Sequence, residues 1–434
     1  MNESFLCSNL SKRNGHLLFA GQDTSMLAST YGTPLYLMDE DRIRDRCRIY
    51  RNAVKQAFGT GHVLYASKAA CFTQMLRIMR DEAMCLDVVS RGELYTALRA
   101  QFPMARVYFH SSNKTDADIA FAIDCGVGYF VVDNLEELAA VDRIAGEKGT
   151  VQSILLRLTP GIDPHTFAAV ATGSADSKFG IPIENGQGAA AARLALQQKH
   201  IRLCGFHCHV GSQVFDSEVF YRSADVMLDF IASFRQSTGY LPDQLDLGGG
   251  YGVRYTLDQP ELDLASNIAS VGTYLRNACS KRNLPMPKIG LEPGRSIVAD
   301  AGLTLYTVGT VKRIPEIVNY VSVDGGMADN IRYALYRAPY TVLPANKMEE
   351  PRTLLATVVG RCCESDDVIQ PDVLLPDSMQ RGDLLAVCTT GAYHYSMASN
   401  YNRLPRPPIV MLQGGTSYVA VRRESLDDLV RNDL

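Results

Sequence analysis

One lysine stands where a buried strand is predicted to end. The segment VLYASKAA (63–70) begins as an apolar, β-prone run and then gives Ser67, Lys68 and small residues that could begin a helix. A lysine in such a place is costly to bury unless its charge is paired with an acid or its amine takes part in chemistry. Lys68 is therefore the first candidate catalytic residue.

Two glycine-bearing turns follow predicted strands later in the chain. They are DLGGGYG (246–252) and EPGR (292–295). Glycine lets backbone N–H groups approach an anion, because no Cβ lies in the way. Each turn alone could be a tight turn, and the arginine a solvated charge. Two of them at neighbouring strand ends favour a phosphate site, which is common after the last two strands of β/α barrels.

A phosphate site together with a strand-end lysine indicates pyridoxal 5'-phosphate (PLP), whose aldehyde condenses with an amine. This cofactor also needs a group that faces its pyridine nitrogen. A carboxylate there keeps the nitrogen protonated, so that the ring can accept electrons from a carbanion. Glu292 is the candidate for this role, and a structural salt bridge is the alternative interpretation.

The segment HCHVGSQ (207–213) raises the question of a metal site, since histidine and cysteine are metal ligands. In a strand, His207 and His209 would point to one side and Cys208 to the other. Two histidines without a nearby acid or cysteine make a poor zinc site. We therefore expect no metal, and we expect His209 to stack on the cofactor ring with Ser212 near the phosphate.

These candidates lie at the ends of short apolar runs that alternate with amphipathic helical patterns. The alternation predicts βαβ units and a parallel sheet, and eight units predict a (β/α)8 TIM-like barrel whose strand ends share one face. A doubly wound open sheet is the alternative, but no helix opens with a G-x-G-x-x-G turn. The eight runs are HVLYAS (62–67), CLDVVS (85–90), RVYFHS (106–111), YFVVDN (129–134), ILLRLTPG (154–161), CGFHCHVG (204–211), QLDLGGG (244–250) and KIGLEPG (288–294).

The pattern changes after about residue 295. Runs such as LTLYTVGTVKRI and DLLAVCTTGAY are separated by turn signals and by few helices, which predicts an all-β domain. The N-terminal runs HLLFAG and PLYLMD could add strands to it. We therefore expect a PLP-binding barrel at 39–295 and a β-sandwich or β-barrel-like domain made of 1–38 and 296–434.

Composition excludes several classes of function. A chain of 434 residues predicts two domains, and a net charge of -4 without a basic stripe gives no electrostatic case for nucleic acid. The polar N-terminus has no signal-peptide core, and no apolar run approaches the roughly 20 residues that span a bilayer. Eleven scattered cysteines without C-x-x-C pairs fit reduced thiols, so we expect a cytoplasmic protein.

An ordered set of motifs resembles the diaminopimelate decarboxylase family of the alanine-racemase-like, fold-type III PLP enzymes. The resemblance runs from about residue 30 to 420 and implies a barrel followed by a β domain. The motifs are YASKA, DVVSRGEL, HTFAAVATGSADSKFG, HCHVGSQ, DLGGGYG, EPGRSIVADAG, CCES and GAYHYSMASNYN.

The resemblance implies a role for each matching residue. Lys68 would hold the cofactor covalently, His209 would stack on its ring, and Cys363 would donate a proton, although a structural cysteine is the commoner fate of a lone thiol. The implied cofactor-binding residues are Lys68, His209, Ser212, Gly249, Gly250, Glu292, Gly294, Arg295 and Tyr393. The implied substrate-binding residues are Arg295, Arg332, Tyr336, Glu364 and Tyr393. In this family a second subunit completes the active site, so the resemblance implies a homodimer.

Three positions differ from the family pattern: Asp366 replaces a usual glycine, His394 replaces a small or apolar residue, and MADNIRYALY is looser than usual. None of these departures removes a cofactor residue, so they bear on the substrate contacts that the resemblance implies and not on the chemistry.

The expected reaction is the PLP-dependent decarboxylation of meso-2,6-diaminopimelate to L-lysine, the last step of lysine biosynthesis. Arg332 or Arg295 would pair with the distal carboxylate and Glu364 with the distal ammonium. The alternatives are a decarboxylase of ornithine, lysine, arginine or carboxynorspermidine, and a catalytically silent relative that binds partners. A racemase fits less well, because Glu292 stands where that chemistry usually has an arginine.

Overall fold

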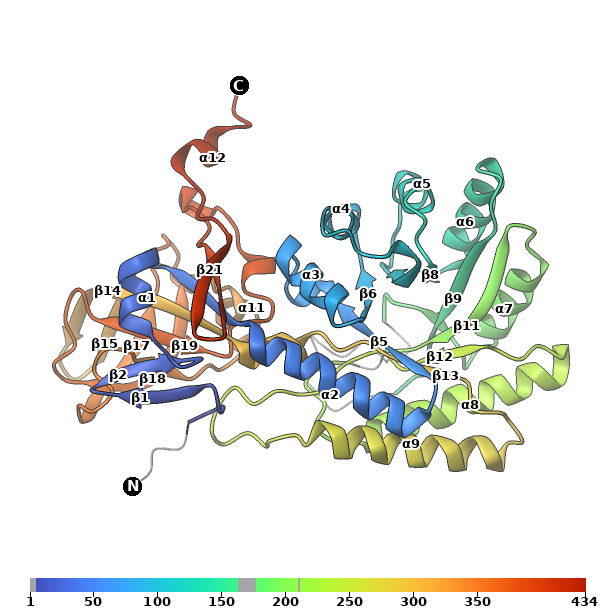
Figure 1. Cartoon of the computed structure of the whole chain (residues 1–434), viewed down its shortest axis with the longest axis horizontal. Helices are drawn as coiled ribbons and strands as arrows, with labels where there is room; N and C mark the ends of the chain where they lie inside the picture. Colours follow the sequence, from blue (N-terminus) through green and yellow to red (C-terminus); the bar gives the residue numbers. More distant parts are fainter. Residues whose placement is uncertain (1–4, 163–176, 210) are drawn as a thin grey trace. The chain divides into compact units, whose positions relative to one another are not determined.

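The computed structural model describes residues 5–162, 177–209 and 211–434 and divides into two compact units (Figure 1). The first, here the barrel unit, contains residues 46–252 and 262–294. The second, here the β unit, contains the described residues up to Asp45 together with residues 253–261 and 295–434.

Eight parallel strands form a closed barrel, which confirms the predicted fold. They follow one another around the barrel in chain order, and the last pairs with the first, with Leu291 of β13 opposite Val63 of β5. All eight predicted runs supply one strand each. The strands are β5 (Gly61–Ala66), β6 (Cys85–Val88), β7 (Val107–Phe109), β8 (Tyr129–Val132), β9 (Gln152–Thr159), β11 (Ile201–His207), β12 (Gln244–Asp246) and β13 (Lys288–Leu291), and the short β10 (Ile181–Pro182) pairs with β9 outside the ring.

Helices lie outside these strands (Figure 1), and several begin at a capping side chain soon after a strand ends. Ser90 accepts a hydrogen bond from the N–H of Glu93, and Asn134 accepts one from the N–H of Glu137. Such caps stabilise a helix by about 1 kcal/mol and fix the point where the chain leaves the barrel. The helices are α2 (Glu40–Phe58), α3 (Thr73–Asp81), α4 (Arg91–Arg99), α5 (Asp116–Asp124), α6 (Leu135–Glu147), α7 (Gln187–Gln197), α8 (Glu218–Thr238) and α9 (Leu264–Lys281).

A packed layer fills the barrel. Leu64, Val131 and Leu155 form a buried cluster with Tyr108, whose ring stacks on that of Tyr129 at a centroid distance of 4.4 Å. The hydroxyl of Tyr108 donates to Oε1 of Gln244 at 3.0 Å, so its one polar group is satisfied in the interior. This packed interior holds the strands that carry the site at their carboxyl ends.

The β unit contains the predicted N-terminal contribution. Strand β4 (Leu35–Asp39) pairs antiparallel with β14 (Gly302–Ile314) and parallel with β20 (Ile409–Gln413), which confirms that the N-terminal region adds a strand to the β domain. The remaining strands are β1 (Leu10–Arg13), β2 (His16–Phe19), β3 (Gln22–Asp23), β15 (Val318–Val323), β16 (Val342–Pro344), β17 (Arg352–Val359), β18 (Val368–Pro376), β19 (Leu384–Cys388) and β21 (Thr416–Val421). Its helices are α1 (Thr24–Tyr31), α10 (Arg295–Val298), α11 (Arg332–Tyr336) and α12 (Leu426–Val430).

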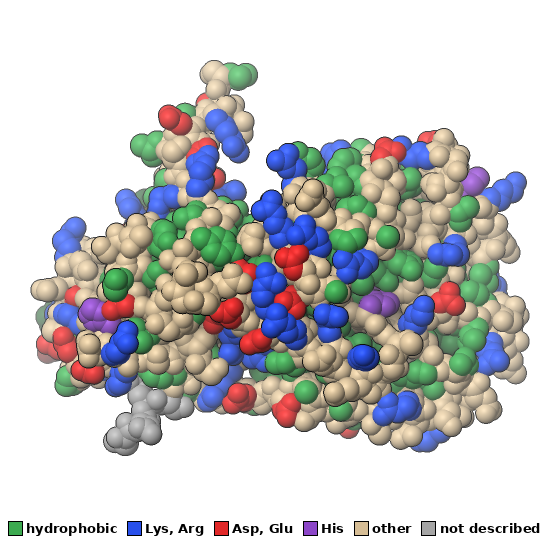
Figure 2. All heavy atoms as spheres, in the orientation of Figure 1, with side chains coloured by type: hydrophobic (Ala, Val, Ile, Leu, Met, Phe, Trp, Pro, Cys, Tyr) green, Lys and Arg blue, Asp and Glu red, His purple; other side chains and the backbone are tan. Residues whose placement is uncertain are grey.

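On the face shown in Figure 2, Lys and Arg side chains are mixed with Asp, Glu and apolar groups. Helices α5 and α6 illustrate this mixture, because Arg143 and Lys148 pair with Asp116 and Asp124 at 2.6 Å each. No helix in the described part of the chain has the length and apolar character needed to cross a membrane.

Candidate active site

Lys68 lies in a short 3-10 turn, Ser67–Ala69, directly after β5. Its side chain is exposed, although both neighbours in the turn are buried. The turn is fixed to the end of β13, because the N–H of Ala66 donates to the carbonyl of Pro293 at 3.1 Å. The amine therefore stands on a rigid strand end, at the face where barrels carry their active sites.

Gly294 packs against this turn. A Cβ at position 294 would lie 3.0 Å from the Cβ of Ala66 and 3.1 Å from that of Ala69. The glycine of EPGR therefore allows two neighbouring strand ends to approach closely. Its direct contact with the cofactor stays a prediction.

Glu292 follows β13 and is only 8% exposed. Both of its carboxylate oxygens contact histidines: Nε2 of His110 lies 2.8 Å from Oε1, and Nε2 of His207 lies 3.1 Å from Oε2. Burial alone raises the pKa of Glu292, but the two histidines outweigh burial and hold that pKa well below its ordinary value. The barrel thus presents a fixed carboxylate anion at its carboxyl end.

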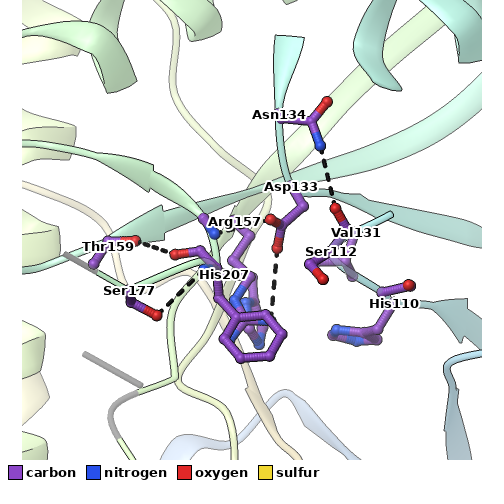
Figure 3. Close-up of polar contacts among 12 residues, drawn as sticks. His110, Ser112, Val131, Asp133, Asn134, Arg157, Thr159, Ser177 and His207 are labelled. Atoms are coloured by element: carbon purple, nitrogen blue, oxygen red, sulfur yellow. Dashed lines mark hydrogen bonds and ion pairs between the residues drawn. The ribbon is translucent and has the colours of Figure 1, made fainter. Parts of the chain in front are cut away.

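The tautomer of His207 follows from its surroundings. Burial lowers the pKa of His207 to about 4, despite the opposing charge of Glu292. Its Nδ1 is buried and has no hydrogen-bond partner among the described residues, so a proton there would be unsatisfied. The neutral ring therefore carries its proton on Nε2 and donates it to Glu292. Its centroid lies 5.0 Å from that of His110 (Figure 3).

Two more carboxyl groups are buried in the same barrel end. Burial, reinforced by the charge of Glu292, raises the pKa of both Asp87 and Asp246. One oxygen of Asp246 accepts a hydrogen bond from the N–H of Gly248 at 2.8 Å, and Oδ1 of Asp87 lies 3.8 Å from Nε2 of His110. The carboxylate of Glu292 is therefore surrounded by acids that resist ionisation.

The glycines at 248–250 form a tight turn that accepts no side chains. A Cβ on Gly249 would lie 2.1 Å from the carbonyl oxygen of Glu292, and one on Gly250 would lie 2.3 Å from that of Gly211. Gly250 also has a φ of +113°, a conformation that favours glycine. The turn fits the expected approach of backbone N–H groups to a phosphate.

His209 is fixed by this turn. Its Nδ1 accepts a hydrogen bond from the N–H of Gly249 at 3.3 Å. Desolvation of the ring and the positive charge of Lys68 lower the pKa of His209 well below its ordinary value, so the ring is neutral near pH 7. A neutral, oriented imidazole close to the lysine suits a stacking role.

Ser212 belongs to a segment that is tied to the glycine turn. It is half-buried, and the neighbouring Val214 donates its N–H to the carbonyl of Gly250 and accepts from the N–H of Gly252, both at 2.9 Å. The structure therefore brings Ser212 beside the segment that contains the three glycines.

Figure 3 shows how residues after the HTFAAVATGSAD stretch attach to the barrel. The N–H of Gly180 donates to Oδ2 of Asp133 at 3.0 Å, and Thr159 donates to the carbonyl of Phe179 at 2.7 Å. The guanidinium of Arg157 lies 4.5 Å from the centre of the Phe179 ring. Most of the motif HTFAAVATGSADSKFG, namely residues 165–176, lies outside the described residues.

In the β unit, two arginines share one aromatic ring. The guanidinium carbons of Arg295 and Arg332 lie 4.8 Å and 5.2 Å from the centre of the Tyr393 ring, and Arg332 also lies 5.0 Å from the ring of Tyr336. Nη1 of Arg295 donates to the hydroxyl of Tyr255 at 2.7 Å. The structure thus brings four of the predicted substrate residues together as a cationic cluster, in which both arginines are buried and both tyrosines are half-buried.

Nε of Arg332 is buried without a hydrogen-bond partner among the described residues. An unsatisfied guanidinium donor is costly to bury, and a carboxylate ligand would remove that cost. This observation supports the predicted substrate role of Arg332.

His394, one of the departures from the family pattern, packs edge-on against Tyr340 at a centroid distance of 5.1 Å. Burial and the charge of Arg332 lower the pKa of His394 to about 3. A neutral ring of this kind replaces an apolar side chain without adding a charge to the cationic cluster.

Cys363 and Glu364 contact a different loop of the β unit. The N–H of Cys363 donates to Oδ1 of Asn402 at 2.8 Å, and the hydroxyl of Tyr401 donates to Oε1 of Glu364. The thiol of Cys363 is exposed, whereas burial raises the pKa of the neighbouring Cys362 to about 11. Cys363 is therefore the accessible thiol of the pair.

Several side chains of the barrel site are not among the residues predicted from the sequence. His110 lies next to the end of the predicted run RVYFHS and Asp246 opens the glycine motif, so the rule that strand ends share one face could have selected these two. Asp87 lies within the run CLDVVS, where that rule does not mark it. We also found no acid close along the chain to accompany His207. The fold supplies one, because Glu292 reaches His207 from another strand.

Comparison with known proteins first gives the class of enzyme to which the chain belongs. The chain matches the family model of the pyridoxal-dependent decarboxylase, pyridoxal binding domain, over residues 40–299, which include all eight barrel strands. It is 43% identical over 422 residues to the diaminopimelate decarboxylase of Bacillus subtilis (strain 168), with 97% of this chain and 96% of that protein covered.

Solved structures agree with this class and narrow it. A crystal structure of diaminopimelate decarboxylase from M. jannaschii with L-lysine matches with a TM-score of 0.90, 31% identity and 98% of both chains covered. A lysine/ornithine decarboxylase from Vibrio vulnificus with putrescine matches with a TM-score of 0.75, 26% identity, and 90% of this chain and 97% of that one covered. The chain belongs to the diaminopimelate decarboxylase family, which confirms the resemblance inferred from its motifs.

Proposed function

We propose that the chain decarboxylates meso-2,6-diaminopimelate to L-lysine and CO2 with PLP as its cofactor, the last step of lysine biosynthesis. The observation that carries this assignment is the 43% identity to a diaminopimelate decarboxylase across nearly the whole of both chains. The test is to incubate the purified protein with meso-diaminopimelate and to assay lysine and CO2.

The residues of the barrel unit fit PLP. Gly249 and Gly250 form a turn that a Cβ would obstruct, Lys68 offers an exposed amine, and Glu292 is an oriented anion. The glycine turn would serve the phosphate of PLP, the amine its aldehyde, and the anion its pyridine nitrogen. Lys68 would hold the aldehyde carbon, His209 would face the ring, and Ser212 would help the glycine turn to bind the phosphate.

When bound, PLP supplies the electron sink that takes up the electron pair released as CO2 leaves Cα. The chain's own residues control the proton and the geometry. Glu292 keeps the proton on the pyridine nitrogen, and the fixed strand ends that carry Lys68 and His209 hold the reacting Cα relative to the ring.

Arg332 would recognise the distal carboxylate of the substrate, supported by its buried Nε without a partner among the described residues. Arg295 has a hydroxyl partner in Tyr255 and would assist by adding positive charge. Glu364 would take the distal ammonium. Ornithine and lysine lack the second carboxylate, so a buried guanidinium would gain nothing from them.

Cys363 would return a proton to Cα, and its exposed thiol supports a homodimer with shared active sites. An exposed donor in a single chain suits a site that a second subunit completes, because proton transfer is best made where water is excluded. Reduced, unbridged cysteines throughout the described residues support the further proposal of a cytoplasmic location.

The alternative is a decarboxylase of the same fold that acts on another basic amino acid. It is kept because the chain also matches a lysine/ornithine decarboxylase, although with a lower TM-score. Mass spectrometry of the products from a panel of diaminopimelate, ornithine, lysine, arginine and carboxynorspermidine separates the two. Release of CO2 from lysine or ornithine in preference to diaminopimelate would overturn the main assignment.

A further inference from the structure

Glu292 is contacted on both carboxylate oxygens by His110 and His207, two residues that have no role in the proposed reaction. His110 follows β7, His207 ends β11 and Glu292 follows β13, so three separate strand ends converge. The side chains of these residues are only 6%, 1% and 7% exposed. Each histidine Nε2 reaches a different carboxylate oxygen, at 2.8 Å and 3.1 Å. We call this arrangement the histidine clamp.

The clamp could be read as a metal site, since the three ligand atoms lie within 4.8 Å of one another. The two nitrogen–oxygen distances fall within the normal range of hydrogen bonds. Ligands on a tetrahedral zinc ion would be spread to roughly 3.3 Å, given metal–ligand distances of about 2.0 to 2.1 Å. The hydrogen bond of His207 to Glu292 and the 2.8 Å polar contact of His110 with Glu292 are both shorter than this spread. Direct contact therefore accounts for the geometry, and the metal becomes an outcome of the test.

The protonation of His207 matters for the charge of the site. A neutral ring with its proton on Nε2 donates a hydrogen bond without adding a positive charge beside a protonated pyridine nitrogen. Other charged or titratable groups that interact electrostatically with Glu292 are Asp87, Asp246, Arg157, Cys208, His62 and His209. The clamp is the part of this environment that directly touches both carboxylate oxygens.

We propose that His110 and His207 are positioning residues that hold Glu292 as an oriented carboxylate and thereby keep the pyridine nitrogen of PLP protonated. The inference rests on the assignment of Glu292 to that nitrogen under the proposed function. His207 donates a hydrogen bond to Oε2 of Glu292 and His110 lies 2.8 Å from Oε1, which leaves lone pairs of the carboxylate for the pyridine N–H. Loss of both donors would free the carboxylate to rotate or to take up a proton itself.

The experiment uses the full chain reconstituted with PLP labelled with 15N at the pyridine nitrogen, because the 15N chemical shift distinguishes pyridine from pyridinium. Wild type is expected to show the protonated nitrogen. The double variant H110F/H207F is expected to raise the ratio of neutral to protonated nitrogen by about tenfold or more, equivalent to one pKa unit. H207Q, which retains an N–H donor, should restore most of the wild-type signal.

H62F is the matched control. His62 is a histidine of the same barrel, and its Nε2 contacts the hydroxyl of Tyr108 at 3.1 Å rather than Glu292. It should leave the 15N shift unchanged. Should the double variant fail to fold, the proton position on His207 in 15N-histidine-labelled wild type decides instead, with a proton on Nε2 and none on Nδ1 expected.

The outcomes distinguish a failure of the histidine clamp from a failure of the proposed placing of Glu292 on the pyridine nitrogen. A double variant that binds PLP with an unchanged pyridinium signal would overturn the clamp. An E292Q variant with an unchanged signal would instead refute the placing of Glu292 on the pyridine nitrogen, whichever substrate the enzyme uses. One equivalent of zinc in the purified protein, lost in H110F/H207F, would replace the clamp by a metal site.

Discussion

The guanidinium of Arg332 lies 5.2 Å from the centre of the Tyr393 ring, and its Nε is buried without a partner among the described residues. Arg332→Ala should therefore raise the KM for diaminopimelate by roughly 10- to 100-fold, because a hydrogen bond to a charged group contributes about 1.5 to 3 kcal/mol. Steady-state kinetics measure this change. Arg337→Ala, which removes an exposed arginine paired with Asp366, is the control and should leave KM unchanged.

The amine of Lys68 should be indispensable. Lys68→Met is expected to lower kcat by several orders of magnitude and to abolish the covalent retention of PLP after borohydride reduction, because the proposed covalent bond to the cofactor needs the amine of this side chain. Mass spectrometry of the reduced protein gives the second readout. Lys288→Met, at the opposite end of β13, should keep both properties. Retained covalent PLP in the Lys68 variant would contradict the assignment.

The glycine turn should be intolerant of side chains. Gly249→Ala places a Cβ 2.1 Å from the carbonyl oxygen of Glu292, so the strand ends must separate and the affinity for PLP should fall. Fluorescence titration with PLP measures the effect. Gly92→Ala, inside α4 with no atom closer than 3.6 Å, should keep the PLP affinity and stabilise the fold by about 0.5 to 1 kcal/mol. Equal PLP affinity in the two variants would refute the steric argument.

One buried acid of the β unit should make stability depend on pH. Burial raises the pKa of Asp329 from 3.8 to about 7, although the hydroxyl of Tyr306 donates to it. The folded state binds this proton more tightly than the unfolded state. The stabilisation that the protonated Asp329 carboxyl gives the fold is therefore complete below about pH 4 and is lost as the pH rises through about 7.

Asp329→Asn should flatten this fall in the free energy of unfolding, as measured by denaturant titrations between about pH 4 and about pH 8. Asp377→Asn, at an exposed acid paired with Arg313, should run parallel to wild type. A profile of Asp329→Asn that is also parallel to wild type would show that the carboxyl is ionised normally in the folded protein.

The proposed shared active site predicts complementation. Equal amounts of Lys68→Met and Cys363→Ala subunits, mixed under conditions of subunit exchange, should recover about one quarter of wild-type activity. Half of the dimers are then mixed, and each mixed dimer has one intact site. If both residues act within one chain, mixing restores nothing.

The strands of the barrel could be predicted because each lies in a short run with apolar residues that is bounded by turn signals, and because βαβ alternation leaves few topologies. The lysine and the glycine turns could be predicted because their residue types are unusual at strand ends. The histidine clamp could not, because His207 and Glu292 are separated by 85 residues and nothing local marks their contact. Residues 253–261, with Tyr255, likewise carry no local signal that they pack with the β unit rather than with the barrel.

The first and last strands of the barrel are neighbours only after the ring of strands has closed, with Gly290 of β13 opposite His62 of β5. During synthesis, the ribosome delivers Lys68 more than 200 residues before Glu292, the acid that we propose acts with it on the cofactor. A partly made chain can therefore hold vitamin B6 only loosely. The yellow colour of a newly made molecule would report that its last barrel strand has docked.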